Sequence, residues 1–399
     1  MNNSLPATDD FPFLLQMHAN AEPWIYLDSA ATTLKPKAVI HAVTHALTNH
    51  STNVHRSVYE LGDITTELYE QSRRKVASFF GAMEHEVVFL RNATEGINLI
   101  ASGYPRNGVS IVSISEHHSN LLPWRKSAFR QIDPLFNESQ YLELLSQELK
   151  KGDVSLVSIS HVNNVTGLQT NVKKVAQLVH QYGAVLVVDA AQSAGRISID
   201  VSELDCDFLV CSGHKMYGPS GIGILYGKSE HLHRLQIQNL GGGTVEKVFD
   251  ERLELRKPPW CFEAGTPAIE SAIGLGAAID YLQNLGMDVV EKYEKELTQY
   301  ALQRLGEIKK CQLIVRDSSH TPAGVISFFL RSESSHVVAR TLSDRYGICI
   351  RSGFHCTQPF HDSLSIPPSL RISFGLYNTV EEINRCMEAL QEITRNSPR

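Results

Sequence analysis

The sequence has 399 residues, 42% of them hydrophobic, which is enough for a large core and for more than one domain. Its formal net charge of −6 and the lack of a long basic block argue against nucleic acid as a partner. No apolar run approaches the ~18–20 residues of a membrane helix, and the first fifteen residues do not resemble a signal peptide. The seven cysteines form no CxxC pair, so we expect reduced thiols in a cytoplasmic protein, with no metal site and no membrane partner.

Short apolar segments alternate with helical segments between about residues 26 and 274. Runs such as AVLVVD at 184–189 are apolar on both faces, as expected for strands of a parallel sheet that helices cover on both sides. This alternation predicts an α/β domain. The predicted elements, in chain order, are a strand at 86–91, a helix at 93–103, strands at 110–115 and 154–160, a helix at 172–183, and strands at 184–190, 208–212 and 221–227.

The pattern changes after about residue 281, where a long charged helical stretch covers 281–308. The last helix opens with TVEE, in which Thr379 and Glu382 have the spacing of a capping box, and its apolar residues then fall on one face. This part of the chain therefore predicts a smaller α+β unit. Its strands are predicted near 324–330, 347–351 and 370–374.

We therefore predict an α/β fold with two domains. The large domain, residues 25–280, carries a mainly parallel sheet flanked by helices and binds the cofactor identified below. The small α+β domain covers residues 281–399, and residues 1–24 are expected to pack on it.

Three clusters of polar residues follow predicted strands, at the sheet edge where ligands gather in α/β folds. Asp189 ends one strand, Lys215 follows the next, and Ala93 and Thr94 begin a helix. Taken alone, each of these residues could have a purely structural role, such as that of a surface lysine or a helix cap. Together they are what pyridoxal phosphate requires: a lysine for the Schiff base, a carboxylate for the pyridine nitrogen and N–H groups for the phosphate.

Longer motifs support this interpretation. The lysine stands in SGHKMYGPSGIGILYG, with VDAAQS upstream and RSGFHCTQP downstream, and further motifs are YLDSAATT, NVHRS, ATEGINL, EHHSNLLPW, NNVTG, LGGG, FEAGTP and SLRISFGLYNT. With these motifs the sequence resembles the fold-type I pyridoxal phosphate enzymes of the class V aminotransferase group. Within that group it resembles the group II cysteine desulfurases (the SufS/CsdA-like branch), over nearly the whole chain from Tyr26 to Thr379.

The resemblance implies roles for residues around the cofactor ring. Lys215 would form the Schiff base, and Asp189 would pair with the pyridine nitrogen. Gln192 would hydrogen-bond the ring oxygen O3′, and His117 would stack on the ring. Asn164 would lie near both the ring oxygen and the substrate.

The resemblance also implies a phosphate site and a second subunit. Ala93, Thr94, Ser212 and His214 would bind the phosphate. Thr266 of EAGTP would reach the phosphate from the other subunit, so the active unit is expected to be a homodimer.

Substrate binding and sulfur chemistry would fall to the C-terminal part. Arg371 would clamp the substrate carboxylate, a geometry that suits the bidentate fork of guanidinium. Cys356 lies in a Gly- and Pro-containing loop and falls on the nucleophile position of the group II form RxGxHC, whereas neighbouring His355 is assigned no role. The other six cysteines lie mostly within or beside apolar runs and are expected to be core residues: Cys206, Cys211, Cys261, Cys311, Cys349 and Cys386.

The implied activity is that of a pyridoxal-phosphate-dependent cysteine desulfurase. Lys215 would remove the Cα proton of L-cysteine, and Cys356 thiolate would take the sulfur as a persulfide and leave L-alanine. The persulfide sulfur would pass to a protein or small-molecule acceptor, as in iron–sulfur cluster assembly. No sequence motif identifies this acceptor.

Two alternatives remain open. The same fold hosts other reactions, those of a C–S lyase, a selenocysteine lyase, an epimerase or an aminotransferase, which need Lys215 and Asp189 but do not all need Cys356. A scaffold without catalysis is the second alternative, although such a protein would be expected to lose these residues.

The chain departs from the family pattern at 124–139, where it is shorter than usual. This shortening is expected to affect an edge of the sheet or a partner surface more than the chemistry, because EHHSN and NNVTG flank it intact. The turn predicted to bind the phosphate, which reads RNATE, is a second and smaller departure from the family pattern.

Overall fold

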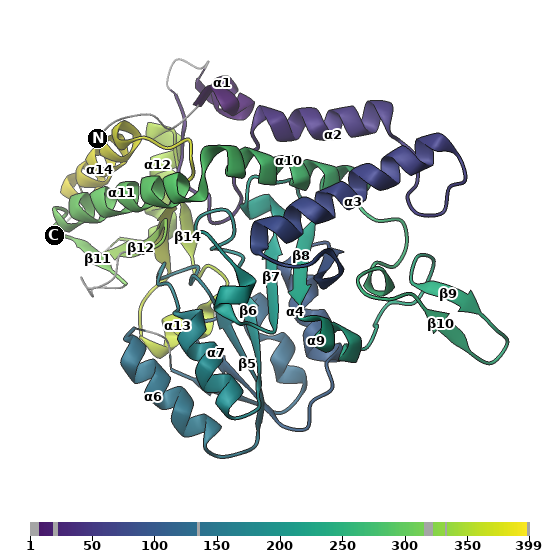
Figure 1. Ribbon diagram of the computed structural model, residues 1–399. Coiled ribbons are helices and arrows are strands. Elements are labelled where there is room, and N and C mark those ends of the chain that lie inside the picture. The colour runs from purple at the N-terminus through teal and green to yellow at the C-terminus, as the bar shows by residue number, and fades with distance from the viewer. Residues whose placement is uncertain (1–7, 19–22, 134–135, 315–321, 332, 397–399) are drawn as a thin grey trace.

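The structure is a computed structural model that describes residues 8–18, 23–133, 136–314, 322–331 and 333–396. It contains a seven-stranded sheet and a separate four-stranded sheet, each packed against helices (Figure 1). Within the described residues, no helix is long and apolar enough to cross a membrane.

The large sheet has the strand order β2-β8-β7-β6-β5-β3-β4. All neighbours from β7 to β4 are parallel, whereas β8 is antiparallel to both β7 and β2, so the predicted mainly parallel sheet is confirmed. The strands are β2 (Val87–Leu90), β3 (Val109–Ser113), β4 (Phe129–Ile132), β5 (Val154–Ser160), β6 (Val185–Asp189), β7 (Phe208–Ser212) and β8 (Gly223–Gly227). The shortened segment thus still supplies an edge strand, β4.

Successive side chains of each strand point to opposite faces, and helices cover both faces of the sheet. In β6, Leu186 and Val188 pack in one cluster with α3, α6, α7 and α10. Val187 packs in another cluster with α4, α5 and Trp124. This double burial explains why the strands are apolar throughout. The helices are α3 (Glu60–Phe80), α4 (Ala93–Gly103), α5 (His118–Leu121), α6 (Glu138–Leu149), α7 (Val172–Gln181) and α10 (Ile269–Leu285).

The small sheet is antiparallel, with the order β11-β12-β15-β14. Leu297, Leu342 and Ile383, from three different helices, pack in one core with its strands. This arrangement matches the predicted α+β unit. Its elements are α11 (Met287–Gly306), β11 (Cys311–Leu313), β12 (Val325–Leu330), α12 (Ser335–Tyr346), β13 (Ile348–Cys349), β14 (Arg351–Gly353), α13 (Gln358–Ser363), β15 (Ser369–Ser373) and α14 (Val380–Asn396).

The last helix, α14, begins as the sequence predicts. The N–H of Glu382 donates to Thr379 Oγ1 at 3.2 Å, and the N–H of Thr379 donates to Glu382 Oε2 at 3.0 Å. This reciprocal pair is the predicted capping box. Ile383, Met387 and Leu390 are fully buried on the same face of the helix.

Two predicted elements of this part are interrupted. The helical stretch 281–308 is divided between α10 and α11, because Gly286 takes a φ of +83° that continues neither helix. The strand predicted at 347–351 is two short strands, of which β13 pairs with β1 (Ile25–Tyr26) and β14 pairs with β15.

The N-terminal helix α1 (Pro12–His18) lies above α10 in Figure 1, and its Leu14 shares a buried cluster with Leu282 of α10. Phe11, just before it, has ring contacts with Tyr217, Tyr281 and Tyr377, which belong to both predicted domains. Helix α10 also runs across the predicted boundary at residues 280 and 281. The domain limits therefore stay a prediction.

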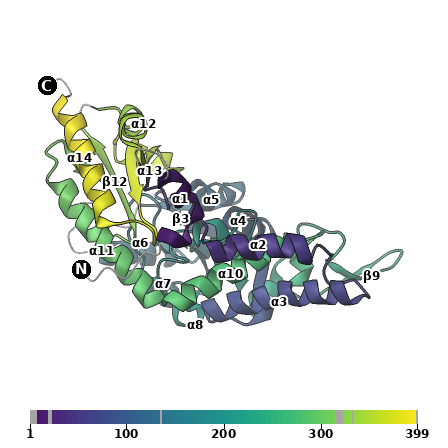
Figure 2. The same ribbon diagram turned by 90° about the horizontal axis from the view of Figure 1, so that it is seen from above.

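The remaining elements lie around the large sheet. The β9–β10 hairpin projects at the end of the molecule far from α14 (Figures 1 and 2). Sequence analysis did not predict this hairpin. The bounds are α2 (Lys37–Asn49), α8 (Val201–Leu204), α9 (Ser229–Arg234), β9 (Val245–Val248) and β10 (Leu253–Leu255), with short 3₁₀ turns at Thr8–Asp10, Glu84–Glu86, Pro123–Lys126, Gly213–Lys215 and Trp260–Phe262.

Candidate active site

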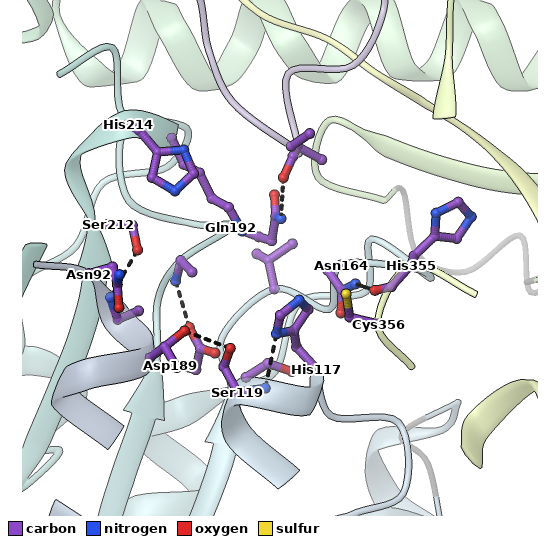
Figure 3. Close-up of a pocket in the computed structure, with 18 of the residues that line it drawn as sticks. Asn92, His117, Ser119, Asn164, Asp189, Gln192, Ser212, His214, His355 and Cys356 are labelled. Carbon is purple, nitrogen blue, oxygen red and sulfur yellow. Dashed lines mark hydrogen bonds between the residues drawn. The ribbon is translucent and has the colours of Figure 1, made fainter. Parts of the chain in front are cut away.

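Most of the residues predicted to hold cofactor and substrate lie around one cavity of about 270 Å³ (Figure 3). Its walls come from the carboxyl ends of β2, β5, β6 and β7 and from the loop between β14 and β15. Ligand sites of α/β sheets form at this edge. Among the predicted residues, the lining includes Ala93, Thr94, His117, Asn164, Asp189, Gln192, Ser212, His214, Lys215, Cys356 and Arg371.

Thr266 lies outside this cavity. It is exposed and lines a separate hollow together with His55, Arg56 and Trp260. One chain alone therefore does not bring Thr266 to Lys215, and its predicted role from a second subunit stays a prediction.

Lys215 ends the short turn that follows β7, and Asp189 ends the neighbouring strand β6. Burial lowers the pKa of the Lys215 ammonium to about 8, although Asp189 acts in the opposite direction. Burial also raises the pKa of the Asp189 carboxyl, against a 2.9 Å hydrogen bond from the N–H of Ala191 and the charge of Lys215. The lysine and the acid therefore stabilise each other's charged form inside one cavity.

The N-terminus of α4 forms one end of the cavity. Asn92 caps this helix by accepting the N–H of Glu95 at 3.0 Å, and the N–H of Ala93 donates to Ser212 Oγ at 2.9 Å. A Cβ atom at Gly223 would lie 2.5 Å from the Cα of Asn92, so only glycine lets β8 approach the helix start this closely. Backbone N–H groups at such an end favour an anion.

Two further polar groups stand near this end. Thr94 Oγ1 and Ser119 Oγ lie 2.7 Å apart and form a hydrogen bond. Burial, followed by the charges of Lys215 and Lys35, lowers the pKa of the His214 imidazole to about 4. His214 is therefore neutral at pH 7 and keeps one N–H donor.

His117 caps the short helix α5 with its ring. Its Nδ1 accepts the N–H of Ser119 at 3.1 Å, so the proton of the neutral ring must lie on Nε2. Burial and the neighbouring charge of Lys215 lower the pKa of His117 to about 3, which keeps the ring neutral over the physiological range. A neutral flat ring with one outward donor suits stacking on an aromatic cofactor.

Gln192 is buried in the cavity wall (Figure 3). Its Nε2 donates to the carbonyl oxygen of Ala30 at 2.8 Å and retains a second proton, while its Oε1 has no partner among the residues that the structure describes. Such a buried, half-satisfied amide is expected where a ligand completes the hydrogen bonds.

Arg371 projects from β15 and is almost fully buried, with 3% of its surface exposed. Its Nη1 donates to the carbonyl oxygen of Asn164 at 3.1 Å, and its Nη2 donates to Asp28 Oδ1 at 3.3 Å. Burial lowers the pKa of its guanidinium to about 10, and its Nε has no partner within the described part of the chain. The guanidinium thus remains charged at pH 7 and retains a donor for a ligand carboxylate.

Sequence analysis missed two charged residues beside Arg371. Arg351, at the start of β14, also lines the cavity, and its Nη1 lies 3.7 Å from Asp28 Oδ2. Asp28 thereby contacts both arginines, which limits their mutual repulsion. The sequence alone could have indicated Arg351 as a site residue, because it is a basic residue at the end of the predicted strand GICIR, just before the loop of Cys356.

Cys356 is exposed and lines the cavity. The carbonyl oxygen of Cys356 accepts the N–H of His118 at 2.8 Å, and the carbonyl oxygen of His355 accepts Asn164 Nδ2 at 2.8 Å. His355 and Cys356 have φ angles of +51° and +58°, unusual for side-chain-bearing residues. The other six cysteines are buried or half-buried, as predicted: Cys206, Cys211, Cys261, Cys311, Cys349 and Cys386.

These groups fit pyridoxal phosphate. The cavity offers a lysine with a lowered pKa beside a buried carboxylate, and an anion site at a helix start. Gln192 Oε1 and Arg371 Nε, both buried, have no hydrogen-bond partner in the described ranges of the chain. Among the described residues, no group of three or more His, Cys, Asp and Glu side chains is arranged to hold a metal ion.

Comparison with known proteins agrees with this site. Residues 25–386 match the aminotransferase class-V family, and the chain therefore belongs to that family. This membership confirms the predicted family, fold and cofactor, pyridoxal phosphate.

Relatives and solved structures narrow the class further. A protein of Synechocystis sp. named "probable cysteine desulfurase" is 43% identical, covering 98% of this chain and 96% of its own. The apo structure of the cysteine desulfurase from Thermococcus onnurineus has a TM-score of 0.91 at 35% identity, covering 98% and 99% of the two chains. The cysteine desulfurase CsdA (S-sulfonic acid) of Escherichia coli has a TM-score of 0.87 at 32% identity, covering 97% of both. These similarities confirm the predicted enzyme class, a pyridoxal-phosphate-dependent cysteine desulfurase.

Proposed function

We propose that this protein converts L-cysteine to L-alanine and takes the sulfur onto Cys356 as a persulfide. The observation that carries this proposal is the position of Cys356, an exposed thiol on the wall of the cavity that contains Lys215 and Arg371. A C–S lyase needs the lysine but has no use for a thiol at that place.

Arg371 binds the carboxylate of L-cysteine. Its position on strand β15, its charge and its Nε, which has no partner among the described side chains and main-chain groups, support this role. Arg351 adds a second positive charge to the same side of the cavity. The carboxylate thereby fixes the substrate in one orientation, which brings its sulfur toward one wall.

Lys215 moves the proton at the Cα of the substrate. A pKa of about 8 leaves a useful fraction of neutral amine near pH 7.5, so the group can accept a proton and return it. When bound, pyridoxal phosphate would supply an aldehyde for the substrate amine and a ring that takes up electrons from the Cα–H bond. Asp189 would keep the ring nitrogen protonated, and His117 would cover one face of the ring.

Cys356 performs the sulfur transfer. Its thiolate attacks Sγ of the substrate, so that a new S–S bond forms and the Cβ–Sγ bond breaks. The electron pair of the broken bond stays with the carbon fragment, which takes up a proton and leaves as L-alanine. Overall, L-cysteine and the Cys356 thiol give L-alanine and a Cys356 persulfide, with no external oxidant or reductant.

The active unit is a homodimer in this proposal. Thr266 and Arg56 line an exposed hollow away from the cavity of their own chain. Large apolar side chains are exposed on α2, just before and at the start of α3, and on the β9–β10 hairpin. The role proposed for Thr266 requires a second copy of this chain as the partner. These side chains are Leu47, Val58, Tyr59, Leu61, Val248 and Leu253.

The persulfide sulfur passes to a thiol of a protein or of a small molecule and serves iron–sulfur cluster assembly in the cytoplasm. Support for a reducing compartment comes from the seven cysteines, all of which are free thiols. The exposure of Cys356 leaves its persulfide accessible to an acceptor.

Mass spectrometry of the Cys356 peptide tests the proposal directly. After a single turnover with L-cysteine and no reductant, the peptide is expected to gain the mass of one sulfur atom, and a thiol should remove it. Release of sulfide with an unmodified Cys356 peptide would support the C–S lyase instead.

A further inference from the structure

Two histidines share one serine behind the cysteine loop. His355 Nε2 and His361 Nε2 each lie 3.0 Å from Ser369 Oγ. His361 Nδ1 lies 3.1 Å from the carbonyl oxygen of Thr357. These groups come from the loop after β14, from α13 and from the start of β15. All three side chains are buried: His355 is 6% exposed, and His361 and Ser369 are not exposed at all.

The hydrogen-bond partners leave one arrangement of protons. The carbonyl oxygen of Thr357 only accepts, so His361 carries its proton on Nδ1 and its Nε2 is an acceptor. Ser369 therefore donates its single hydroxyl proton to His361. Its oxygen must then accept from His355, which places the proton of His355 on Nε2. Burial lowers the pKa of both imidazoles, to about 2 for His355, so both rings are neutral.

This order defines a directed relay from His355 through Ser369 to His361 and Thr357. The relay anchors the residue directly before Cys356 to the core of the small sheet. It adds to the two bonds that hold the main-chain oxygens of His355 and Cys356. A left-handed backbone at two successive residues with side chains persists only where the surroundings fix it.

We propose that His355, Ser369 and His361 are positioning residues whose hydrogen-bond relay holds Cys356 in place for sulfur transfer. The inference rests on the proposed function, since it assigns a task to the loop of the nucleophile. His355 does not act as the base for Cys356. Figure 3 shows its ring on the side of the backbone away from the Cys356 sulfur.

The protonation order is measured by ¹⁵N NMR of histidine-labelled holoenzyme, with His355→Gln and His361→Gln spectra to assign the signals. We expect His355 as the Nε2–H form and His361 as the Nδ1–H form, both neutral at pH 7.5. A His355 ring protonated on Nδ1, or a charged ring at either position, overturns the relay.

Function is tested with Ser369→Ala, which removes the central hydroxyl, and Ser369→Thr, which keeps it. Ser327→Ala is the matched control, because Ser327 is a buried serine of the same sheet whose Oγ has no hydrogen-bond partner among the described residues. We expect Ser369→Ala to lower kcat for sulfide release about 10-fold while KM for L-cysteine changes less than about twofold. Ser369→Thr and Ser327→Ala should stay near wild type.

Alkylation of Cys356 by iodoacetamide provides a readout that does not depend on the reaction. The rate at Cys356 in the holoenzyme should change about fivefold or more in Ser369→Ala and not in Ser327→Ala. An unchanged alkylation rate, or a kcat equal to that of wild type, overturns the inference. If wild type releases no sulfide, the proposed function fails, while the NMR and alkylation results still decide the relay.

Discussion

The N–H of His118 donates to the carbonyl oxygen of Cys356 at 2.8 Å. This bond joins the start of α5, beside the large sheet, to the loop that carries the exposed thiol of the small sheet. His117, whose ring lines the same cavity, is the residue directly before the donor. The two walls of the cavity that carry His117 and Cys356 are therefore fixed to each other through main-chain atoms, independently of any side chain at positions 118 and 356.

Replacing Arg371 by lysine tests carboxylate recognition. Lysine keeps a positive charge but loses the fork and the bonds to Asn164 and Asp28. We expect KM for L-cysteine to rise about 30-fold, corresponding to ~2 kcal/mol, as expected for hydrogen bonds to a charged group. Arg351→Lys, at a more exposed position, should change KM by less than about threefold. Steady-state kinetics measure both, and equal effects of the two variants would contradict the assignment.

Mixed dimers test whether Thr266 acts from the second subunit. Lys215→Ala and Thr266→Ala homodimers should both have little activity. After subunit exchange, each hybrid contains one site with both native residues. With equal amounts and random exchange, activity should recover to about one quarter of wild type. Such a recovery of activity would show that Thr266 of one subunit acts in the active site of the other subunit. A mixture that stays inactive although light scattering and mass spectrometry show hybrids would place Thr266 in its own chain's site or outside the mechanism.

Asp207 should make stability depend on pH. Although its burial acts to raise the pKa, contacts with His231, the N–H of Leu186, Lys228 and His180 hold the pKa of this carboxyl well below its usual range. A lowered pKa stabilises the fold above the unfolded-state value near ~4, and the contribution is lost as the pH falls toward the folded-state value.

Asp207→Asn is therefore expected to lower the free energy of unfolding by about 2 kcal/mol at pH 7. The difference from wild type should shrink below about pH 4, where the unfolded carboxyl is protonated. Thermal unfolding of both proteins at several pH values measures this. A difference that is constant with pH would show that the charge of Asp207 is unimportant.

Arg196 and Glu294 should contribute to stability as a pair. Arg196 follows β6, and its Nη1 donates to Glu294 Oε2 of α11 at 2.5 Å and to the carbonyl oxygen of Phe374 at 2.9 Å. Both side chains are buried, so Glu294→Gln leaves a buried charge unpaired and is expected to cost about 3 kcal/mol. Adding Arg196→Met should cost less than the two single changes together. Denaturant unfolding of wild type, both single variants and the double variant measures this double-mutant cycle. If the two single losses of unfolding free energy simply add up in the double variant, the two residues are not coupled.

Much of the fold was predictable because its signals are local. The helix at 93–103 and the strand at 154–160 have their predicted bounds, and the capping box of Thr379 and Glu382 is as expected. Gly286 shows where local sequence signals fail to predict a helix end. Its positive φ divides a stretch in which the residues on both sides favour a helix. The pairing of β13 could not be predicted locally either, because its partner strand β1 lies far away in the sequence.

The cavity residues were predictable for a different reason. The carboxyl ends of parallel strands share one edge, so Asp189, Lys215 and Thr94 must meet once the strands are assigned. Arg351 and Asp28 were missed because their role comes from a contact between segments about 320 residues apart. The relay of His355, Ser369 and His361 was equally invisible, because it exists only when the loop, α13 and β15 pack together.

The most direct measurement is product analysis of purified holoenzyme with L-cysteine and a reductant, for wild type and Cys356→Ala in parallel. Cys349→Ala is the matched control, a half-buried cysteine on the neighbouring strand. We predict equal amounts of L-alanine and sulfide from wild type and from Cys349→Ala, and neither product from Cys356→Ala. Pyruvate and ammonia alongside sulfide in all three proteins would contradict the account and identify a lyase in which Cys356 has no part.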